Sequence, residues 1–313
     1  MSTTQIVGGL HHVGLRVGHL ADAKARWCQI LGLHGEAIAA HAAILRCTYE
    51  DYALHLMESA DPAGLDYVCY ELAAGVSLDA AAQVLGDRGA AVGRAEVPVR
   101  GAALEVTDPD GHRVRLVAHV RPDDTRPAEV RHSARIPGFH PRKLGHVNFL
   151  TADVQRQVRW YTDVLGFRVT DWIGTEGVWL HVDRDHHVIA FLDKGTRHIH
   201  HVAFELVDWG EMRVALDHLA QNRRHIVWGP GRHGMARNLF SYFRMREEDL
   251  FVELFADLEQ LPAHHVPRHF PDDPHSSNTW GILPPRTYFR FDQAAIEAEE
   301  SQAYAYGQAI PPP

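Results

Sequence analysis

Two copies of one pattern of strands and helices make up most of the chain, and this repeat restricts its fold more than any other sequence feature. Each copy begins with a strand-like segment that carries a histidine, His12 or His146, and continues with a segment of helical spacing. Tyr67 follows His12 by 55 residues, and His201 follows His146 by 55 residues. Because the two spacings agree, we interpret the repeat as an internal duplication. The chain should therefore fold into two similar α+β halves.

The sequence divides into these two halves and a tail. Residues 120–141 are rich in proline and charge and lack apolar periodicity, which is typical of a linker. We predict an N-terminal domain over residues 1–135 and a C-terminal domain over residues 136–262. The remaining residues, 263–313, contain many prolines and isolated aromatic side chains. We expect this tail to pack on the body of the protein and consider it a candidate lid.

Composition and charge exclude several classes of protein. With 45% hydrophobic and 23% charged residues the chain is typical of globular proteins, and its net charge of -9 argues against nucleic acid as the main partner. The first residues lack the layout of a secretory signal, and no apolar run is long enough to cross a membrane. Cys28, Cys47 and Cys69 are odd in number and lack CxxC spacing, which indicates reduced thiols. We expect a cytoplasmic protein.

Three residues of the second copy could share a metal ion. Glu253 lies in the apolar run VELF, where a carboxylate should be buried and should need a cation or another partner. His146 and His201 lie in two further β-type segments. Two histidines and one carboxylate from three strands suit an Fe(II) site with open coordination positions, and the same ligands accept Mn(II). His200 is the alternative ligand next to His201, but neighbouring strand residues face opposite sides, and the phase of the repeat favours His201.

The duplication provides an internal comparison for this site. At the positions that correspond to the three proposed ligands, the first copy carries His12, Tyr67 and Arg115. An arginine cannot replace a carboxylate ligand, because it brings a positive charge toward the metal. We therefore predict that only the second half binds a metal ion.

These residues and their spacing resemble the vicinal-oxygen-chelate superfamily, and within it the type I extradiol ring-cleaving dioxygenases. The resemblance covers most of residues 10–255 and implies tandem βαβββ modules with Fe(II) in the C-terminal half. Nearby His181 and His186 are expected to be structural strand histidines. The resemblance implies that His146, His201 and Glu253 bind the metal. It assigns proton transfer to His187 in HHVIAF. It assigns substrate positioning to His233 in GRHG and to Tyr242.

The nearest subgroup is homoprotocatechuate 2,3-dioxygenase, together with catechol 2,3-dioxygenase. The chain resembles the former in HVN, which ends at Asn148, in GPGRHG, and in Trp179, eight residues before the acid–base histidine. It departs from that subgroup at Trp228, where the subgroup has an arginine that helps to bind the substrate carboxylate. Arg286 or Arg290 of the tail could supply that charge instead. We expect Asn148, Trp179, Trp228 and Arg286 to line the pocket for substrate and oxygen.

The resemblance implies an enzyme that cleaves catechols. Both atoms of O2 would enter a catecholic ring beside the diol, and the product would be a semialdehyde of the muconic type. Catechol and O2 are the expected partners, and the family implies a homo-oligomer, often a tetramer. Two alternatives remain open. One is a glyoxalase-like metal-dependent isomerase or lyase of the same superfamily, and the other is a metal-free small-molecule-binding protein of the bleomycin-resistance kind.

Overall fold

Each half of the chain forms two consecutive βαβββ modules, which confirms the predicted α+β fold of tandem modules. The computed structural model describes residues 5–48, 50–120, 138–285 and 288. The first half consists of β1 (Val7–Val17), α1 (Leu20–Leu31), β2 (His34–Ala39), β3 (Ala42–Arg46), β4 (Leu54–Glu58), β5 (Gly64–Leu72), α2 (Leu78–Asp87), β6 (Gly93–Val97), β7 (Gly101–Thr107) and β8 (Arg113–Val117). The second half consists of β9 (Lys143–Thr151), α3 (Val154–Trp160) with a π-helical turn (Tyr161–Leu165), β10 (Arg168–Ile173), β11 (Gly177–His181), β12 (Ile189–Asp193), β13 (His198–Glu205), α4 (Trp209–Gln221), β14 (Ile226–Arg232), β15 (Leu239–Met245), a 3-10 turn (Arg246–Glu248) and β16 (Leu250–Ala256). The described part of the tail adds β17 (Arg268–Phe270) and α5 (Pro274–Ser277).

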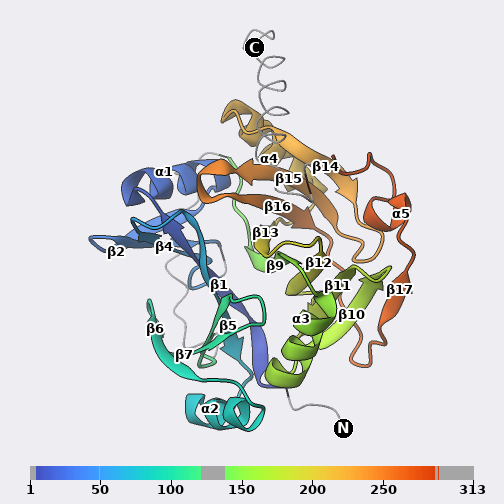
Figure 1. Cartoon of the computed structure of the whole chain (residues 1–313). Coiled ribbons are helices and arrows are strands. Elements are labelled where there is room, and N and C mark those ends of the chain that lie inside the picture. Colours follow the sequence, from blue (N-terminus) through green and yellow to red (C-terminus); the bar gives the residue numbers. More distant parts are fainter. Residues whose placement is uncertain (1–4, 49, 121–137, 286–287, 289–313) are drawn as a thin grey trace.

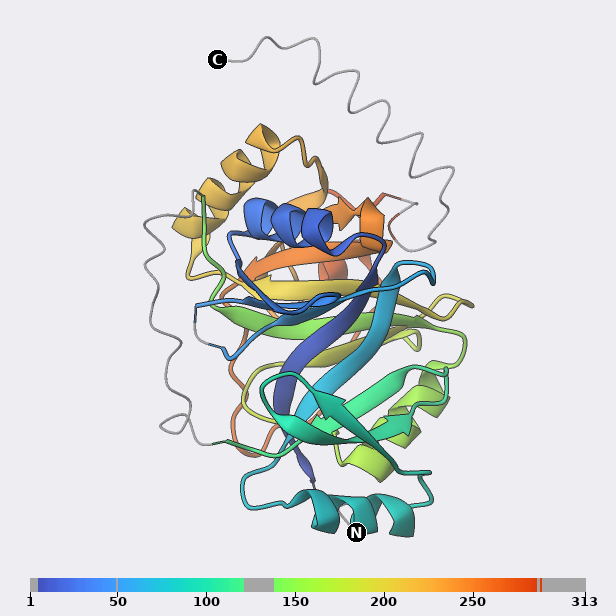
Figure 2. The same ribbon diagram turned by 90° about the vertical axis from the view of Figure 1, so that its left-hand side faces the viewer.

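The strands form two curled sheets, one from each half, which lie side by side (Figure 1). The first sheet has eight strands in the order β2-β3-β4-β1-β5-β8-β7-β6. The second sheet has nine strands in the order β14-β15-β16-β13-β9-β12-β11-β10-β17. Helices α1, α2 and α4 lie at the periphery of the molecule (Figure 2).

The register between neighbouring strands is the same in both halves. β5 lies between β1 and β8, and β13 lies in the same way between β9 and β16. One residue of each central strand therefore pairs with a residue on both neighbours. The two equivalent rows are His12–Cys69–Arg115 in the first half and His146–Ala203–Glu253 in the second half. Because paired residues present their side chains on one face of a sheet, the outer members of each row point the same way.

Strand β16 shows how the sequence places a charged group in an apolar strand. Side chains alternate between the two faces of a strand, so Val252 and Leu254 point away from Glu253 and join the main apolar core. Burial of each apolar side chain stabilises the fold by roughly 1.5–3 kcal/mol. Helix α4 packs on β16 and is capped at its N-terminus by Asp208, whose carboxylate accepts a hydrogen bond from the backbone N–H of Glu211. The apolar face thus fixes the strand, and its other face carries the carboxylate.

The described part of the tail runs along the second half. Strand β17 pairs with β10 in parallel, at the edge of the second sheet (Figure 1). The backbone N–H of Gly234 donates to the carbonyl oxygen of Ser276, 3.1 Å away, which joins the tail to the segment after β14. Most of the predicted linker and residues 289–313 lie outside the described residues.

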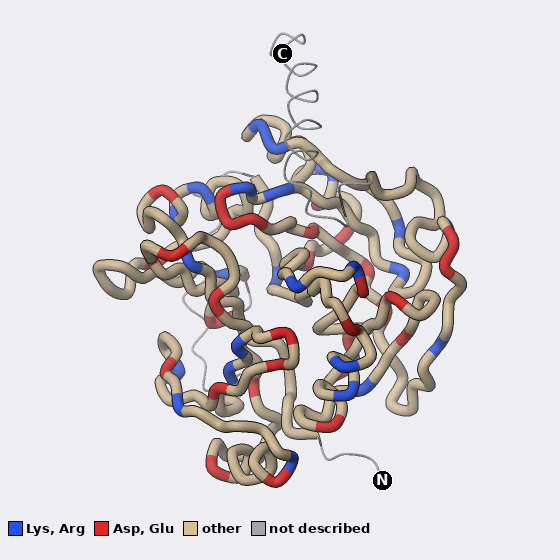
Figure 3. The backbone as a smooth tube through the Cα atoms, in the orientation of Figure 1, with Lys and Arg blue, Asp and Glu red and all other residues tan. Residues whose placement is uncertain are grey.

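The surface carries charges of both signs. Acidic and basic residues are interspersed over the described part of both halves (Figure 3). The three cysteines, Cys28, Cys47 and Cys69, are free thiols. Among the described residues, no helix combines the length and the apolar character needed to cross a membrane.

Candidate metal centre and substrate pocket

Three neighbouring strands bring two imidazoles and a carboxylate together. His146 lies on β9, His201 on β13 and Glu253 on β16. The Oε2 atom of Glu253 lies 2.9 Å from His146 Nε2 and 3.2 Å from His201 Nε2. One ligand atom from each residue lies within 4.8 Å of the other two, and all three side chains are buried. The strand register thus places three candidate metal ligands on one face of the sheet.

The chemical state of these groups fits a divalent metal ion. Burial alone would raise the pKa of Glu253, but the His146 and His201 rings outweigh it and hold that pKa well below its usual range. Burial lowers the pKa of His201 to about 4. An ionised carboxylate and a neutral imidazole are the forms that bind metals. Three protein ligands also leave coordination positions open, whereas structural zinc sites close with four.

His200 orients His201 and is not itself one of the three groups. The Nδ1 atoms of the two rings lie 2.7 Å apart, and His200 Nε2 lies 2.7 Å from the backbone carbonyl oxygen of Tyr288. A carbonyl only accepts hydrogen bonds, so His200 Nε2 carries a proton. Burial lowers the pKa of His200 well below its usual range, so its Nδ1 has no proton and accepts from His201 Nδ1–H. With this proton on Nδ1, neutral His201 keeps on Nε2 the lone pair that metal binding requires.

A cavity of about 130 Å³ lies beside the three groups. Arg286 and Arg290, which the sequence suggested for this pocket or its charge, lie outside the described residues. The buried Oδ1 atom of Asn148 has no hydrogen-bond partner among the described residues, so it is an acceptor that a bound molecule could use. The six other residues predicted for the site line the cavity together with the three metal-binding groups: Asn148, Trp179, His187, Trp228, His233 and Tyr242.

His233 and Tyr242 form a hydrogen-bonded pair in the cavity wall. His233 Nδ1 lies 2.7 Å from the carbonyl oxygen of Ser277, so this nitrogen donates. Burial lowers the pKa of His233, and its unprotonated Nε2 accepts from the Tyr242 hydroxyl at 3.0 Å. Burial, followed by the charge of Glu253, raises the pKa of Tyr242 well above its usual range. The phenol therefore stays protonated and donates to His233, which leaves its oxygen lone pairs as acceptors.

His187 lies two residues before β12, and its ring packs on the ring of His146. The ring centroids of His187 and His146 are 4.1 Å apart. Burial lowers the pKa of His187 well below its usual range, and the His146 and His186 rings lower it further. His187 is therefore neutral near pH 7 and can accept a proton from a group in the cavity.

Sequence reasoning missed Tyr288, which comes from the tail and is buried in the same wall. Its ring lies 4.9 Å from Trp228 and 5.0 Å from Tyr242, measured between centroids. Trp228 in turn stacks on Tyr242, with centroids 5.4 Å apart and an angle of 12° between the planes. The isolated aromatic residues of the tail were the only sequence signal for this contact. Further wall residues outside the prediction include Glu176, Lys194, Met235, Asp272 and Ser277.

At the position equivalent to Glu253, the first half carries the positively charged side chain of Arg115. The guanidinium carbon of Arg115 lies 3.9 Å from the ring centroid of Tyr67. A separate group, His11, His12 and Cys69, also has ligand atoms within 4.8 Å of one another. Burial raises the pKa of the Cys69 thiol, so the thiol stays protonated and is a poor metal ligand. These observations favour the second half as the metal site, and metal binding by that half alone stays a prediction.

Comparison with known proteins gives one family and several relatives. Residues 9–116 and 143–249 match the family described as Glyoxalase/Bleomycin resistance protein/Dioxygenase superfamily. Metapyrocatechase 2 from Cupriavidus necator is 29% identical over 170 residues, which cover 50% of this chain and 53% of that protein. The match thus spans about half the length of that relative. Metapyrocatechase from Geobacillus stearothermophilus is 25% identical over 295 residues, which cover 88% of this chain and 89% of that protein.

Two solved structures have similar folds. The Mn(II)-bound glyoxalase from Novosphingobium aromaticivorans has a TM-score of 0.79 and 25% identity, with coverage of 91% of this chain and 94% of that chain. Homoprotocatechuate 2,3-dioxygenase from Brevibacterium fuscum has a TM-score of 0.78 and 23% identity, with coverage of 92% of this chain and 93% of that chain. The second likeness supports the fold alone. The relatives named as metapyrocatechases and 2,3-dioxygenases are extradiol ring-cleaving enzymes.

Proposed function

The chain belongs to the Glyoxalase/Bleomycin resistance protein/Dioxygenase superfamily, and we propose that it is an extradiol dioxygenase that cleaves a catechol ring beside its two hydroxyl groups. Both atoms of O2 enter the product, a muconic-type semialdehyde, so the reaction needs no external reductant. In this proposal, residues 1–135 form a domain without metal, residues 136–262 form the catalytic domain, and residues 263–313 form the tail. A homo-oligomer is part of the proposal through the family alone.

One observation carries the proposal: the metal-binding groups and the proton-handling groups converge on one cavity. His146, His201 and Glu253 lie on one side, and His187 and the His233–Tyr242 pair line the same space. A metal-free binding protein would not need an ionised carboxylate buried between two imidazoles, because an isolated buried charge is costly. The convergence therefore favours an enzyme over a metal-free binding protein.

We infer that His146, His201 and Glu253 hold Fe(II) and that Mn(II) is the alternative ion, since this ligand set accepts both. When bound there, the metal would lower the pKa of a catechol hydroxyl and bring the diol and O2 together. A solved relative in fold carries Mn(II). Reconstitution of metal-free protein with each ion separately would assign the active one.

The remaining residues bind, orient and exchange protons. His187 accepts the proton of a catechol hydroxyl in the cavity and later returns it. The Tyr242 oxygen, whose proton is directed to His233, accepts a hydrogen bond from the second hydroxyl. Asn148 supplies a further acceptor, and the aromatic wall of Trp179 and Trp228 packs on the substrate ring. His187 and Tyr242 are neutral, and Asn148 Oδ1 has no other hydrogen-bond partner among the described residues.

The direct test is anaerobic purification followed by metal analysis and a screen of substituted catechols. We expect metal bound at one ion per chain, a new yellow chromophore with at least one catechol, and uptake of one O2 per product formed. Metal-loaded protein that forms no yellow product and consumes no O2 with any catechol of the screen would contradict the proposal.

A glyoxalase-like isomerase is the second candidate, because a Mn(II)-bound glyoxalase is among the similar structures. The first half offers Tyr67 and Arg115 at the positions equivalent to His201 and Glu253, which does not favour a site shared by both halves. Oxygen uptake separates the two candidates, since isomerisation consumes no O2.

A further inference from the structure

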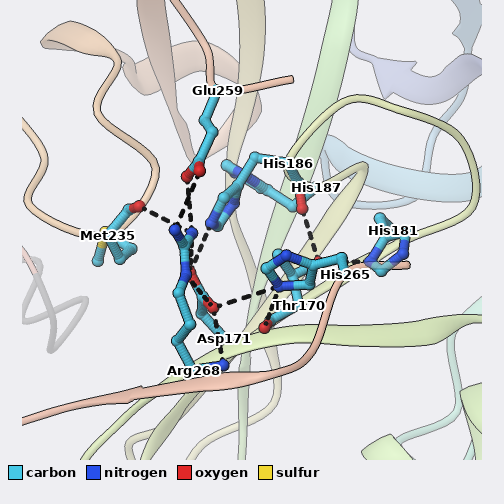
Figure 4. Close-up of polar contacts among 9 residues, drawn as sticks. All are labelled: Thr170, Asp171, His181, His186, His187, Met235, Glu259, His265 and Arg268. Atoms are coloured by element: carbon cyan, nitrogen blue, oxygen red, sulfur yellow. Dashed lines mark hydrogen bonds and ion pairs between the residues drawn. The ribbon is translucent and has the colours of Figure 1, made fainter. Parts of the chain in front are cut away.

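A chain of buried hydrogen bonds leads from His187 away from the cavity to a carboxylate (Figure 4). The Nδ1 atom of His187 lies 3.0 Å from His186 Nδ1, and His186 Nε2 lies 2.8 Å from Asp171 Oδ2. His186 and Asp171 have no solvent exposure, and His187 is 3% exposed. Two histidines that are adjacent in sequence are thus joined through their Nδ1 atoms, and the outer one ends on an acidic group.

The acidic end of this chain is held ionised by an arginine. Arg268 donates to Asp171 from Nη2 at 2.7 Å, from Nε at 3.0 Å and from its backbone N–H at 3.1 Å. Burial alone would raise the pKa of Asp171, but hydrogen bonds from His186 and Arg268 outweigh it and lower the pKa. An ionised carboxylate only accepts hydrogen bonds. His186 Nε2 must therefore carry the proton of its bond to Asp171.

The proton on His186 Nε2 determines the position of the next proton along these hydrogen bonds. Burial lowers the pKa of His186, so the ring is neutral and carries a single proton, on Nε2. Its Nδ1 is then an acceptor, and it can bond to His187 only if His187 Nδ1 is the donor. Nδ1 of His187 therefore carries a proton, and in the form of the ring with one proton the lone pair is on Nε2.

The backbone of the outer histidine is also fixed. The hydroxyl of Thr170 donates to the carbonyl oxygen of His186 at 2.7 Å. Because that hydroxyl has a single proton, it accepts from His181 Nδ1, 2.6 Å away. His265 Nε2 in turn lies 3.0 Å from the carbonyl oxygen of Thr170. The position of His186 therefore rests on a network of hydrogen bonds in addition to the contact with Asp171 (Figure 4).

We infer that Asp171 and His186 are positioning residues that hold His187 in its Nδ1–H form, so that Nε2 is the atom that accepts the substrate proton. The part of this inference that concerns the substrate rests on the proposed function, whereas the proton positions do not. Selection of the correct tautomer by a buried carboxylate is the role of aspartate in serine-protease triads. Here a second histidine lies between the carboxylate and the base.

Asp171→Asn tests the inference because it should reverse the direction of both hydrogen bonds that join Asp171, His186 and His187. The amide oxygen would keep the place of Oδ1, where it accepts from the backbone N–H and Nε of Arg268. The amide NH2 would take the place of Oδ2, where it faces His186 Nε2 and donates to it, while Arg268 Nη2, which donates to Oδ2 in the wild type, keeps its bond to Glu259. His186 would carry its proton on Nδ1, and His187 would have to accept on Nδ1 and carry its proton on Nε2.

Glu259→Gln is the matched control. Glu259 pairs with the same guanidinium as Asp171, through Arg268 Nη2 at 2.6 Å. Its backbone carbonyl accepts from the backbone N–H of His186 at 3.0 Å, a bond that the change to Gln leaves in place. Both variants therefore remove one negative charge from one ion-pair cluster. Only the change at Asp171 should alter the histidine tautomers.

The readout that does not depend on activity is nitrogen-15 NMR of the histidine rings in metal-free protein. We expect the Nε2–H form of His186 and the Nδ1–H form of His187 in the wild type and in Glu259→Gln, and the reverse in Asp171→Asn. Wild-type His187 with its proton on Nε2, or an Asp171→Asn spectrum with unchanged tautomers, would overturn the inference. If no catechol is cleaved, the proposed function fails while the NMR result still stands.

Kinetics provide the second readout. With a competent catechol, Asp171→Asn should lower kcat by about 10²- to 10⁴-fold, with KM changed only a few-fold and metal content unchanged. If Asp171→Asn does not fold, His186→Phe replaces it, since this change keeps a buried ring and breaks the chain. His186→Phe should give mixed His187 tautomers and a comparable loss of kcat. A kcat within about twofold of wild type in the folded variant would contradict the inference.

Discussion

Glu253 and Arg115 occupy the same position in the two halves, yet Glu253 lies between two imidazoles and Arg115 lies over a tyrosine ring. In the second half the buried carboxylate faces His146 and His201, and in our proposal a metal ion from solution supplies the cation. In the first half the cation is part of the protein, and it is held by Glu105 at 2.8 Å. One strand register thus supports a candidate metal site in one half and an internal ion pair in the other.

Replacement of His187 should separate proton transfer from metal binding. His187→Phe keeps a ring on His146 but removes the nitrogen that accepts a proton. We expect the variant to keep its iron and to bind catechol, whereas turnover should fall by roughly two to four orders of magnitude. Stopped-flow assays and iron analysis of the purified variant provide the measurements. Loss of iron would mean that His187 is a ligand.

Substrate preference should follow the aromatic wall of the cavity. Trp228 stacks on Tyr242, and its indole N–H donates to the carbonyl oxygen of Ile282 at 2.8 Å. An indole carries no positive charge that could pair with a substrate carboxylate. Lys194, also in the wall, is paired with Glu176 at 2.8 Å. We expect higher kcat/KM for uncharged catechols than for 3,4-dihydroxyphenylacetate. A hundredfold preference for the carboxylate, about 2.7 kcal/mol of transition-state binding, would contradict this expectation.

Glu50 should make stability depend on pH in a defined direction. Its Oε1 atom accepts from the backbone N–H of Leu144 at 2.9 Å, which links the two halves, and burial raises its pKa from 4.5 to about 8. The folded protein therefore favours the protonated acid, and this stabilisation is complete below pH 4.5 and lost as the pH rises through 8.

Glu50→Gln mimics the protonated form and checks that direction. The variant and the wild type should have similar unfolding free energies below about pH 4.5, and the variant should become the more stable one as the pH rises to about 8. Urea unfolding of both proteins between pH 4 and pH 9 gives the comparison. A difference in free energy that stays constant over this range would show that Glu50 titrates normally.

Much of the fold was predictable because the repeat carries its own register. Equal spacing from His12 to Tyr67 and from His146 to His201 reflects strands that pair in the same order. The phase of the repeat also predicts that His201, and not His200, is the candidate ligand, and the structure places His201 beside Glu253. Simple alternation does not hold at this pair, because the register is irregular between Ile199 and His201 and the two rings touch through their Nδ1 atoms.

Contacts that depend on the path of the tail were not predictable. Asp171 and Arg268 are 97 positions apart, and no sequence signal indicates that they form an ion pair, because the contact arises only when β17 pairs with β10. The sequence predicted only a structural role for His186, because its contact with Asp171 was not apparent either. Tyr288 reaches the cavity wall through a segment without periodicity, which no pattern of apolar residues could reveal.

The most direct measurement is iron per chain in two matched variants, Glu253→Gln and Arg115→Gln, by elemental analysis after anaerobic purification. Glu253→Gln leaves a neutral amide against the metal, so the affinity should fall by more than the roughly 10- to 100-fold typical when a supporting group is lost, and ring cleavage should vanish with the iron. Arg115→Gln should keep iron and activity near the wild-type values. Loss of metal in Arg115→Gln together with its retention in Glu253→Gln would show that the metal site lies in the first half and would contradict the account.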